Sequence, residues 1–140
     1  MNLSTTISLL HRKMNVELNV RLRKIGLSHG MARLLLHLYH HDTMTQADLC
    51  RNLEMDKSTV AKLLARMESD GLIEKQVNNL DVRSYTVSLT PKAYKLIPKI
   101  QEVMLGWSKD VTSDMSLMEK ELFYQMLHEV ARKAVSICHK

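Results

Sequence analysis

Two helix-start signals stand close together near the middle of the chain, and their spacing limits what this segment can fold into. Thr45 is followed three residues later by Asp48, a capping pattern that predicts a short helix ending near Asn52. Asp56 then predicts the start of a second helix over residues 57–70. Because only about four residues separate the two helices, the segment is expected to form a helix-turn-helix.

The first of these helices is expected to turn Ala47, Leu49 and Leu53 toward the core. The turn between the helices lacks the glycine often found there, and Glu54 stands in its place.

An alternating stretch follows the second helix directly. Tyr85, Val87 and Leu89 are apolar at every second residue, the spacing of a half-buried strand, and Ile73 and Val77 mark an earlier strand. The turn signal NNLD separates the two strands. A β-hairpin is therefore predicted, and a hairpin placed directly after a helix-turn-helix is a wing.

The N-terminal part of the chain has helical periodicity. Apolar residues spaced three or four apart predict one long helix over residues 3–25 with a narrow apolar seam, ended by Gly26. Ser28 is expected to cap a second helix, which is apolar nearly all round and ends near residues 40–42.

The C-terminal part is also helical. Thr90 and Pro91 predict the start of a helix, with a kink rather than a stop near Pro98. Ser116 and Glu119 form a second capping pattern, which opens a last helix with a broad apolar face. The predicted fold class is mostly α: a winged helix-turn-helix with long N- and C-terminal helices.

Composition and charge bound the function classes. The chain has 140 residues and a net charge of +5, which favours a polyanionic partner. No apolar run approaches the roughly 18 residues that a membrane span needs, and the N-terminus has no signal-peptide pattern. Cys50 and Cys138 form no CxxC motif and are expected to be reduced. A soluble, cytoplasmic protein with no membrane partner and no cofactor is expected.

The predicted second helix of the helix-turn-helix has an unusual outer face. With Val60 at the centre of the buried stripe of a helical wheel, the opposite side carries Ser58, Lys62, Ala65 and Ser69. A helix enters the DNA major groove, about 12 Å wide, only if its leading face is slim enough to approach base edges. Small and hydroxylated residues permit this approach, whereas the alternative is a solvated helix face with two cations.

Each polar position on this helix-turn-helix has a chemistry that suits DNA. Ser58 and Thr59 lie in the first helical turn, where free backbone N–H groups favour a phosphate. Lys62 and Arg66, one turn apart, suit guanine or the phosphate backbone. The candidate DNA-binding residues on the two helices are Gln46, Arg51, Lys57, Ser58, Thr59, Lys62 and Arg66.

The wing adds two further candidates. Arg83 follows Asp81 near the hairpin tip, and an arginine on a narrow hairpin suits the minor groove, where negative potential is concentrated. Asp81 would orient that guanidinium or brace the hairpin. The alternative is a surface ion pair worth about 0 to 1 kcal/mol.

At this point the residues resemble a known family. The stretches GLSHGMARLLLHL, MTQADLCRNLEMDKSTVAKLLARMESDGLIEK, DVRS and LTPKA are similar to the MarR (multiple-antibiotic-resistance regulator) family of bacterial winged-helix repressors, over about residues 25–93. The resemblance implies a homodimer with intertwined N- and C-terminal helices that reads a pseudo-palindrome in double-stranded DNA. It places Ser84 where many relatives have a second cation, which points to a weaker minor-groove grip.

The dimer is also expected from apolar patterning. The first and last helices present more apolar surface than one winged-helix core covers. We therefore expect residues 28–91 to form the DNA-binding lobe of a single-chain regulator spanning 1–140, and residues 1–25 and 92–140 to form dimerisation helices. Two recognition helices about 34 Å apart would then require a palindromic operator.

The resemblance implies a small-molecule effector pocket between the dimer helices and the DNA-binding lobe. Met and aromatic residues at helical spacing are candidates for lining it, although ordinary core packing explains the same pattern. The candidates are Met14, Met31, Tyr39, Met104 and Trp107.

Two sensing variants stay open. His37, His40 and His41 with His128 or His11 would suit a zinc site, and solvated or capping histidines are the alternative. Cys50 would suit a redox switch, whereas a buried small hydrophobic residue is the ordinary role of a lone cysteine.

Other function classes have less support in the sequence. A winged-helix module for protein contact would use the same slim helix face. An enzyme is disfavoured, because no paired carboxylates, activated nucleophile, Gly-rich phosphate loop or strong metal motif is present in the sequence.

Overall fold

The computed structural model describes residues 2–78 and 81–138. The chain divides into two compact units, Met1–Met104 and Leu105–Lys140. The first unit contains five helices, four of them complete, and a small sheet among its described residues; the second contains the end of one helix and all of the last. The predicted fold class, mostly α with a winged helix-turn-helix, is confirmed.

Helix α1 (Leu3–Arg23) begins where the Asn2 side chain accepts a hydrogen bond from the backbone of Thr5. It ends two residues earlier than the sequence predicts, and Gly26 with φ +78° turns the chain toward α2. Only Leu18 and Leu22 of this helix are buried. The helix therefore packs into its own unit through its C-terminal end.

Helix α2 (His29–His41) forms the centre of the core of the first unit. Ser28 caps it, as predicted, by accepting a hydrogen bond from the backbone N–H of Met31 at 3.2 Å. Leu34, Leu35 and Leu38 have no exposed surface. An apolar pattern nearly all round suits this packed helix, although Tyr39, His40 and His41 at its C-terminal end are exposed.

Helices α3 (Gln46–Leu53) and α4 (Lys57–Ser69) form the predicted helix-turn-helix. Both hydrogen bonds of the predicted Thr45/Asp48 capping box are present. Glu54 follows α3 in the left-handed region, with φ 51° and ψ 43°. Its backbone N–H donates to the carbonyl of Cys50, so this residue ends the helix as a glycine commonly would.

One local prediction in this motif is wrong. Ala47 is exposed and Leu53 is half-buried, so only Leu49 of the predicted inward residues is fully buried. Asp56 takes the predicted N-cap position of α4 but makes no side-chain cap hydrogen bond. Its carboxylate accepts instead from the Ser58 hydroxyl at 2.6 Å, so a nearby hydroxyl has replaced the backbone donor.

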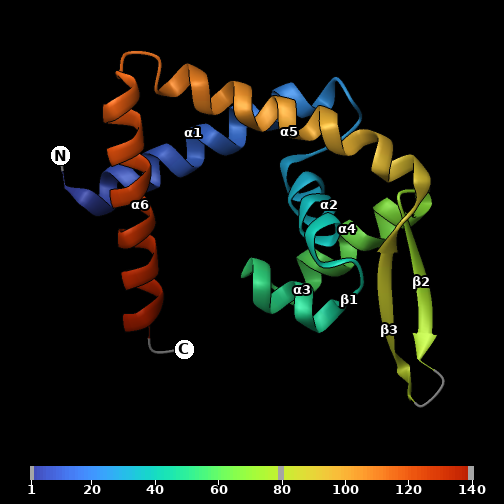
Figure 1. Ribbon diagram of the computed structural model, residues 1–140. Helices are drawn as coiled ribbons and strands as arrows, with labels where there is room; N and C mark the ends of the chain where they lie inside the picture. Colours follow the sequence, from blue (N-terminus) through green and yellow to red (C-terminus); the bar gives the residue numbers. More distant parts are fainter. Residues whose placement is uncertain (1, 79–80, 139–140) are drawn as a thin grey trace. The chain divides into compact units, whose positions relative to one another are not determined.

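The hairpin consists of β2 (Ile73–Asn78) and β3 (Asp81–Leu89), paired antiparallel as predicted. A two-residue strand, β1 (Met44–Thr45), adds to the other side of β3, so the sheet has the order β1-β3-β2. In Figure 1 the hairpin extends away from α2 and α4 as a wing. The predicted turn at 78–81 includes residues 79–80, which lie outside the described residues.

Helix α5 (Pro91–Val111) begins after Thr90 and runs through Pro98 without a break. Helix α6 (Leu117–Ile137) begins at the predicted capping box of Ser116 and Glu119, and none of its residues is buried within the chain. Among the described residues, none of the helices combines the length and the hydropathy needed to cross a membrane.

Candidate nucleic-acid interface

The two sides of α4 differ as the sequence predicts. Val60, Leu64 and Met67 are completely buried, and they fix the helix on the core. The opposite side is exposed along its whole length and carries Ser58, Thr59, Lys62, Ala65, Arg66 and Ser69. Because the outward side chains are short apart from two cations, the backbone of α4 is open to close approach along this face.

The first turn of α4 holds a local hydrogen-bond network. The hydroxyls of Ser58 and Thr59 lower the pKa of the Asp56 carboxyl below its ordinary value. The Ser58 hydroxyl is the donor in this pair, so its oxygen keeps free lone pairs while its proton is already used.

Arg66 and Lys62 differ in how strongly they are held. The Arg66 Nε donates to the Asp70 carboxylate at 3.2 Å, an exposed pair one turn apart on the same helix. Within the described part of the chain, the Lys62 ammonium has no hydrogen-bond or ion-pair partner. The pair with Asp70 orients the Arg66 guanidinium along the helix, and its other N–H groups can still donate to a ligand.

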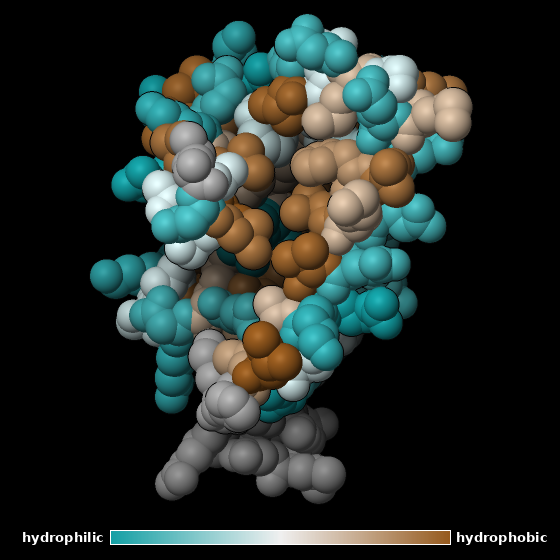
Figure 2. Space-filling model, turned by 90° about the vertical axis from the view of Figure 1, so that its left-hand side faces the viewer, coloured by the Kyte–Doolittle hydropathy of each residue, from teal (hydrophilic) through white to brown (hydrophobic). Residues whose placement is uncertain are grey.

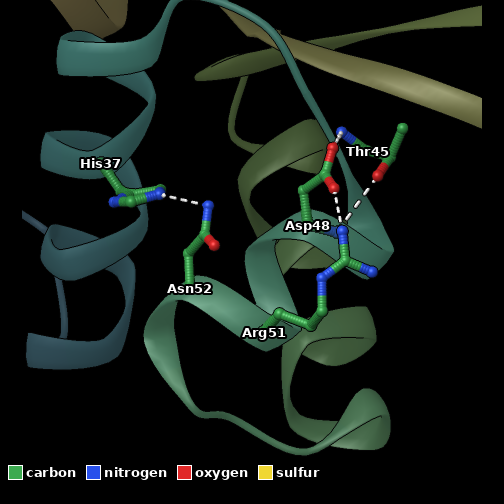
Figure 3. A network of polar contacts seen from close by, with 5 residues as sticks. All are labelled: His37, Thr45, Asp48, Arg51 and Asn52. Carbon is green, nitrogen blue, oxygen red and sulfur yellow. Dashed lines mark hydrogen bonds and ion pairs between the residues drawn. The ribbon is translucent and has the colours of Figure 1, made fainter. Parts of the chain in front are cut away.

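Arg51 is positioned by the capping box at the start of α3 (Figure 3). Its guanidinium pairs with the Asp48 carboxylate, which also accepts from the backbone N–H of Thr45 at 3.3 Å. Hydrogen bonds from Thr45 are the main cause of a lowered pKa at Asp48, and the Arg51 charge adds to the effect. The Arg51 side chain stays 70% exposed, so it is anchored at the protein surface and still accessible.

Sequence reasoning missed the role of Tyr85. Its hydroxyl donates to the side-chain Oε1 atom of Gln46 at 2.5 Å and so ties α3 to the wing strand β3. The Lys75 ammonium lies 4.7 Å from the centre of the Tyr85 ring, a cation–π contact. A hollow of about 500 Å³ beside this contact is lined by Thr45, Gln46, Ala47, Cys50, Arg51, Lys57 and Tyr85. The alternation that predicted a strand at Tyr85 gave no sign of its partner, because Gln46 is far away in the sequence.

The C-terminal end of α4 is tied to the start of α5. The buried Thr90 hydroxyl donates to the Gly71 carbonyl at 2.7 Å, and the Thr90 backbone N–H donates to the Leu72 carbonyl at 3.1 Å. The Lys92 ammonium donates to the Asp70 carbonyl at 2.6 Å. These bonds hold α4 at the end opposite to its first turn.

The wing candidates Asp81 and Arg83 lie at the start of β3. The structure places their backbone in the strand, and their side chains, like that of Ser84, lie outside the described residues.

The candidate effector residues differ in burial and in their contacts. Met31 is buried and lines a hollow beside α4, whereas Met14 and Met104 are half-buried. Tyr39 is exposed and stacks edge-on against Tyr94 at 6.2 Å between ring centres. Trp107 belongs to the second unit.

The histidine and cysteine candidates have ordinary contacts. The His37 ring lies 4.3 Å from that of His41, and its Nε2 faces the Asn52 amide nitrogen at 3.2 Å (Figure 3). Burial lowers the pKa of His37, with His41 and His40 adding to the effect. Over residues 2–78 and 81–138, no three His, Cys, Asp or Glu side chains are grouped so that they could hold a metal ion. Cys50 is half-buried and Cys138 is exposed.

Comparison with known proteins gives a consistent picture. The family model described as MarR family matches residues 25–84. The organic hydroperoxide resistance transcriptional regulator of Bacillus subtilis (strain 168) is 29% identical over 123 residues, which is 84% of each chain.

Solved structures agree with this match. A MarR transcriptional regulator from Methanosarcina mazei Go1 superposes with a TM-score of 0.90 at 25% identity, covering 96% of this chain and 97% of that one. S. aureus MepR, solved with DNA, has a TM-score of 0.83 at 24% identity and covers 99% of both chains, which shows the shared fold.

The names of these relatives describe regulators, in agreement with the expectation that the chain is not an enzyme. The helix-turn-helix, the wing and the flanking helices thus correspond to those of relatives in sequence and in structure. In sequence and in fold, the chain is similar to the MarR family of winged-helix transcriptional regulators.

Proposed function

We propose that the protein is a sequence-specific, double-stranded DNA-binding repressor that acts as a homodimer on a pseudo-palindromic operator. The observation that carries the proposal is α4, whose apolar side is completely buried and whose other side is slim, hydroxylated and exposed along the helix. Such a helix fits the major groove, where base edges are read. The similar fold of S. aureus MepR, which was solved with DNA, supports the same use of this fold here.

The proposed DNA contact of each candidate residue follows from its position in the fold. Lys62 and Arg66 contact guanine or the neighbouring backbone, and Ser58 and Thr59 bind phosphate or base at the first turn of α4. Gln46, Arg51 and Lys57 hold the backbone beside α3, and Asp81 and Arg83 serve the wing in the minor groove.

Exposed apolar side chains support the homodimer. On α6, Leu122, Met126 and Val130 are 56%, 56% and 43% exposed, and on α1 Ile7 is 46% exposed. Figure 2 shows apolar side chains, in brown, standing at the surface among polar ones. Exposed apolar surface of this extent marks a contact surface, and a second copy of the chain with the same helices covers it symmetrically. We propose residues 1–25 and 92–140 as the dimerisation helices and residues 28–91 as the DNA-binding lobe.

We also propose that a small-molecule effector controls DNA binding. Such a ligand acts only if it binds one arrangement of the two DNA-binding lobes more tightly than the other. Met14, Met31, Tyr39, Met104 and Trp107 stay the candidates for contacting it.

Selection of bound fragments from random DNA tests the central proposal. Two half-sites in inverted orientation, with centres about 10 base pairs apart, are the expected result. Recovery of no enriched sequence would contradict sequence-specific binding and favour a winged-helix module for protein contact.

The Arg66→Ala variant tests the role of α4 once an operator is known. Specific affinity is expected to fall by about 1–3 kcal/mol, with sequence preference relaxed at one position of each half-site. The Glu68→Ala variant on the same helix is the control, because Glu68 lies outside the candidate residues and binding should be retained. Unchanged operator affinity in Arg66→Ala would remove this residue from base reading.

A further inference from the structure

A second hollow, of about 450 Å³, lies beside α4 against the turn that joins α1 to α2. Its apolar lining includes Leu27 and Met31, both only 4% exposed. Its charged lining consists of Arg23, at the last position of α1, and Lys62 and Arg66 of α4. The hollow therefore joins the candidate DNA-binding face of α4 to a helix outside the winged-helix lobe.

Gly30 lies where α2 closely approaches α4. A Cβ atom at this position would lie 3.1 Å from the Leu63 Cδ1 atom, closer than ordinary van der Waals contact. Leu63 also lines the hollow. The missing side chain at Gly30 thus lets the start of α2, and with it the end of α1, approach the flank of the recognition helix.

The charges around this hollow are one-sided. Its lining contains three cations and no carboxylate. The Arg66 guanidinium has a partner in Asp70, whereas neither the Arg23 guanidinium nor the Lys62 ammonium has a hydrogen-bond or ion-pair partner within the described part of the chain. Three guanidinium and ammonium groups around one concave surface produce a positive potential that an anion lowers.

We propose that this hollow holds a phosphate of the DNA backbone at the edge of the groove that α4 enters, and that Arg23 is a DNA contact. The inference rests on the proposed DNA-binding function and extends it to a residue of α1. A phosphate fits better than a base, because Arg23 flanks α4 and does not belong to its slim leading face. Phosphates line the groove edge, and contacts to them fix position without reading sequence.

The test measures the affinity of the full-length protein for its selected operator and for a scrambled duplex over a salt series. Loss of one phosphate contact reduces the slope of log affinity against log salt by about 1. With a slope of about 0.9 per phosphate, Arg23→Gln is expected to lose about fivefold in affinity per contact at ~0.15 M salt. The loss should be equal for both duplexes, and Arg23→Lys, which keeps the charge, should keep the salt slope.

Arg12→Gln is the matched control, since Arg12 is an exposed arginine of the same helix outside the hollow. This variant should bind both duplexes with the salt slope of the unaltered protein. The inference is overturned if Arg23→Gln matches Arg12→Gln in affinity and slope, or if it changes base preference instead. Failure of the unaltered protein to bind any duplex would overturn the proposed function itself, which separates the two cases.

Discussion

Glu54 holds a backbone conformation that side chains other than glycine rarely adopt. With φ 51° and ψ 43° it ends α3 in the left-handed region, where Cβ approaches the following carbonyl oxygen. The Glu54→Gly variant removes this contact, so the free energy of unfolding is expected to rise by about 1 kcal/mol, measured by urea denaturation.

The same substitution at Glu102 provides the control. Glu102 is exposed in the interior of α5, where glycine costs about 1 kcal/mol of helix stability. Opposite signs for the two variants are therefore expected. A loss of stability in Glu54→Gly would show that the glutamate side chain contributes more than its backbone conformation costs.

His29 is the buried histidine of α2, with 8% of its surface exposed. Its Nδ1 bonds the Asn15 Oδ1 at 2.5 Å, and its backbone N–H donates to Asn19 at 2.7 Å. Burial is the main cause of its lowered pKa, with Arg33 and His11 adding repulsion. The folded state therefore resists protonating this ring.

This shift gives a pH dependence of stability. The unfolded chain binds a proton at its ordinary pKa of about 6.5, before the folded state does, so stability falls as the pH falls below that value. The steepest slope for one such group is about 1.4 kcal/mol per pH unit.

Urea denaturation between about pH 7.5 and pH 5.5 measures this loss of stability. Ordinary carboxylates titrate below this pH range, so they contribute little to it. His37 contributes in the same direction, because its pKa is lowered too. His29→Gln should therefore flatten the curve only in part. An identical slope in His29→Gln and the unaltered chain would exclude His29 as its source.

Single residues were predictable where their signal is local. Ser28, Thr45 and Ser116 were placed correctly as helix caps, because a cap and its backbone partner lie within three residues of each other. The pairing of Tyr85 with Gln46 was not predictable, because the fold alone brings these residues together. Asp56 is a different case, because it takes the predicted N-cap position while its carboxylate accepts from the hydroxyl of Ser58, two residues away, and makes no cap hydrogen bond.

At the scale of elements, α4 depends on its tie to α5 through Thr90. Thr90→Val keeps the shape of the side chain but removes the donor to the Gly71 carbonyl and the acceptor of the buried Ala93 backbone N–H. The free energy of unfolding is expected to fall by about 1–3 kcal/mol, measured by thermal or urea denaturation. Thr6→Val is the control, because the Thr6 hydroxyl bonds the Asn2 carbonyl at an exposed site and its loss should cost little. Equal effects of the two substitutions would contradict a special role for Thr90.

Element prediction succeeded where a period extends over several residues and failed where it does not. The alternation of Tyr85, Val87 and Leu89 was enough to predict the wing strand. Strand β1 has only two residues, Met44 and Thr45, paired with Val87 and Thr86, and two residues show no period. The slim face of α4 was predictable from a helical wheel. The hollow beside Gly30 was not predictable from the sequence, because it depends on how α2 packs against α4.

For the whole molecule, the exposed apolar side of α6 leads to the last prediction. The proposed homodimer buries Val130, which is 43% exposed in the single chain, so Val130→Glu places a charge in the contact. Burial of an unpaired charge is far costlier than its exposure, and the dimer should dissociate. Sedimentation at micromolar concentration is expected to show about twice 16.2 kDa for the unaltered chain and 16.2 kDa for the variant.

Gln125→Glu adds the same charge to α6 at an exposed position on the side away from Val130, so this variant should stay dimeric. Monomeric Val130→Glu should also lose most operator affinity, since a single lobe keeps only one half-site. A dimer that withstands the Val130 substitution would place the contact surface elsewhere. A monomeric unaltered chain would instead remove the physical reason for a palindromic operator, because that symmetry requires two copies related by a two-fold axis.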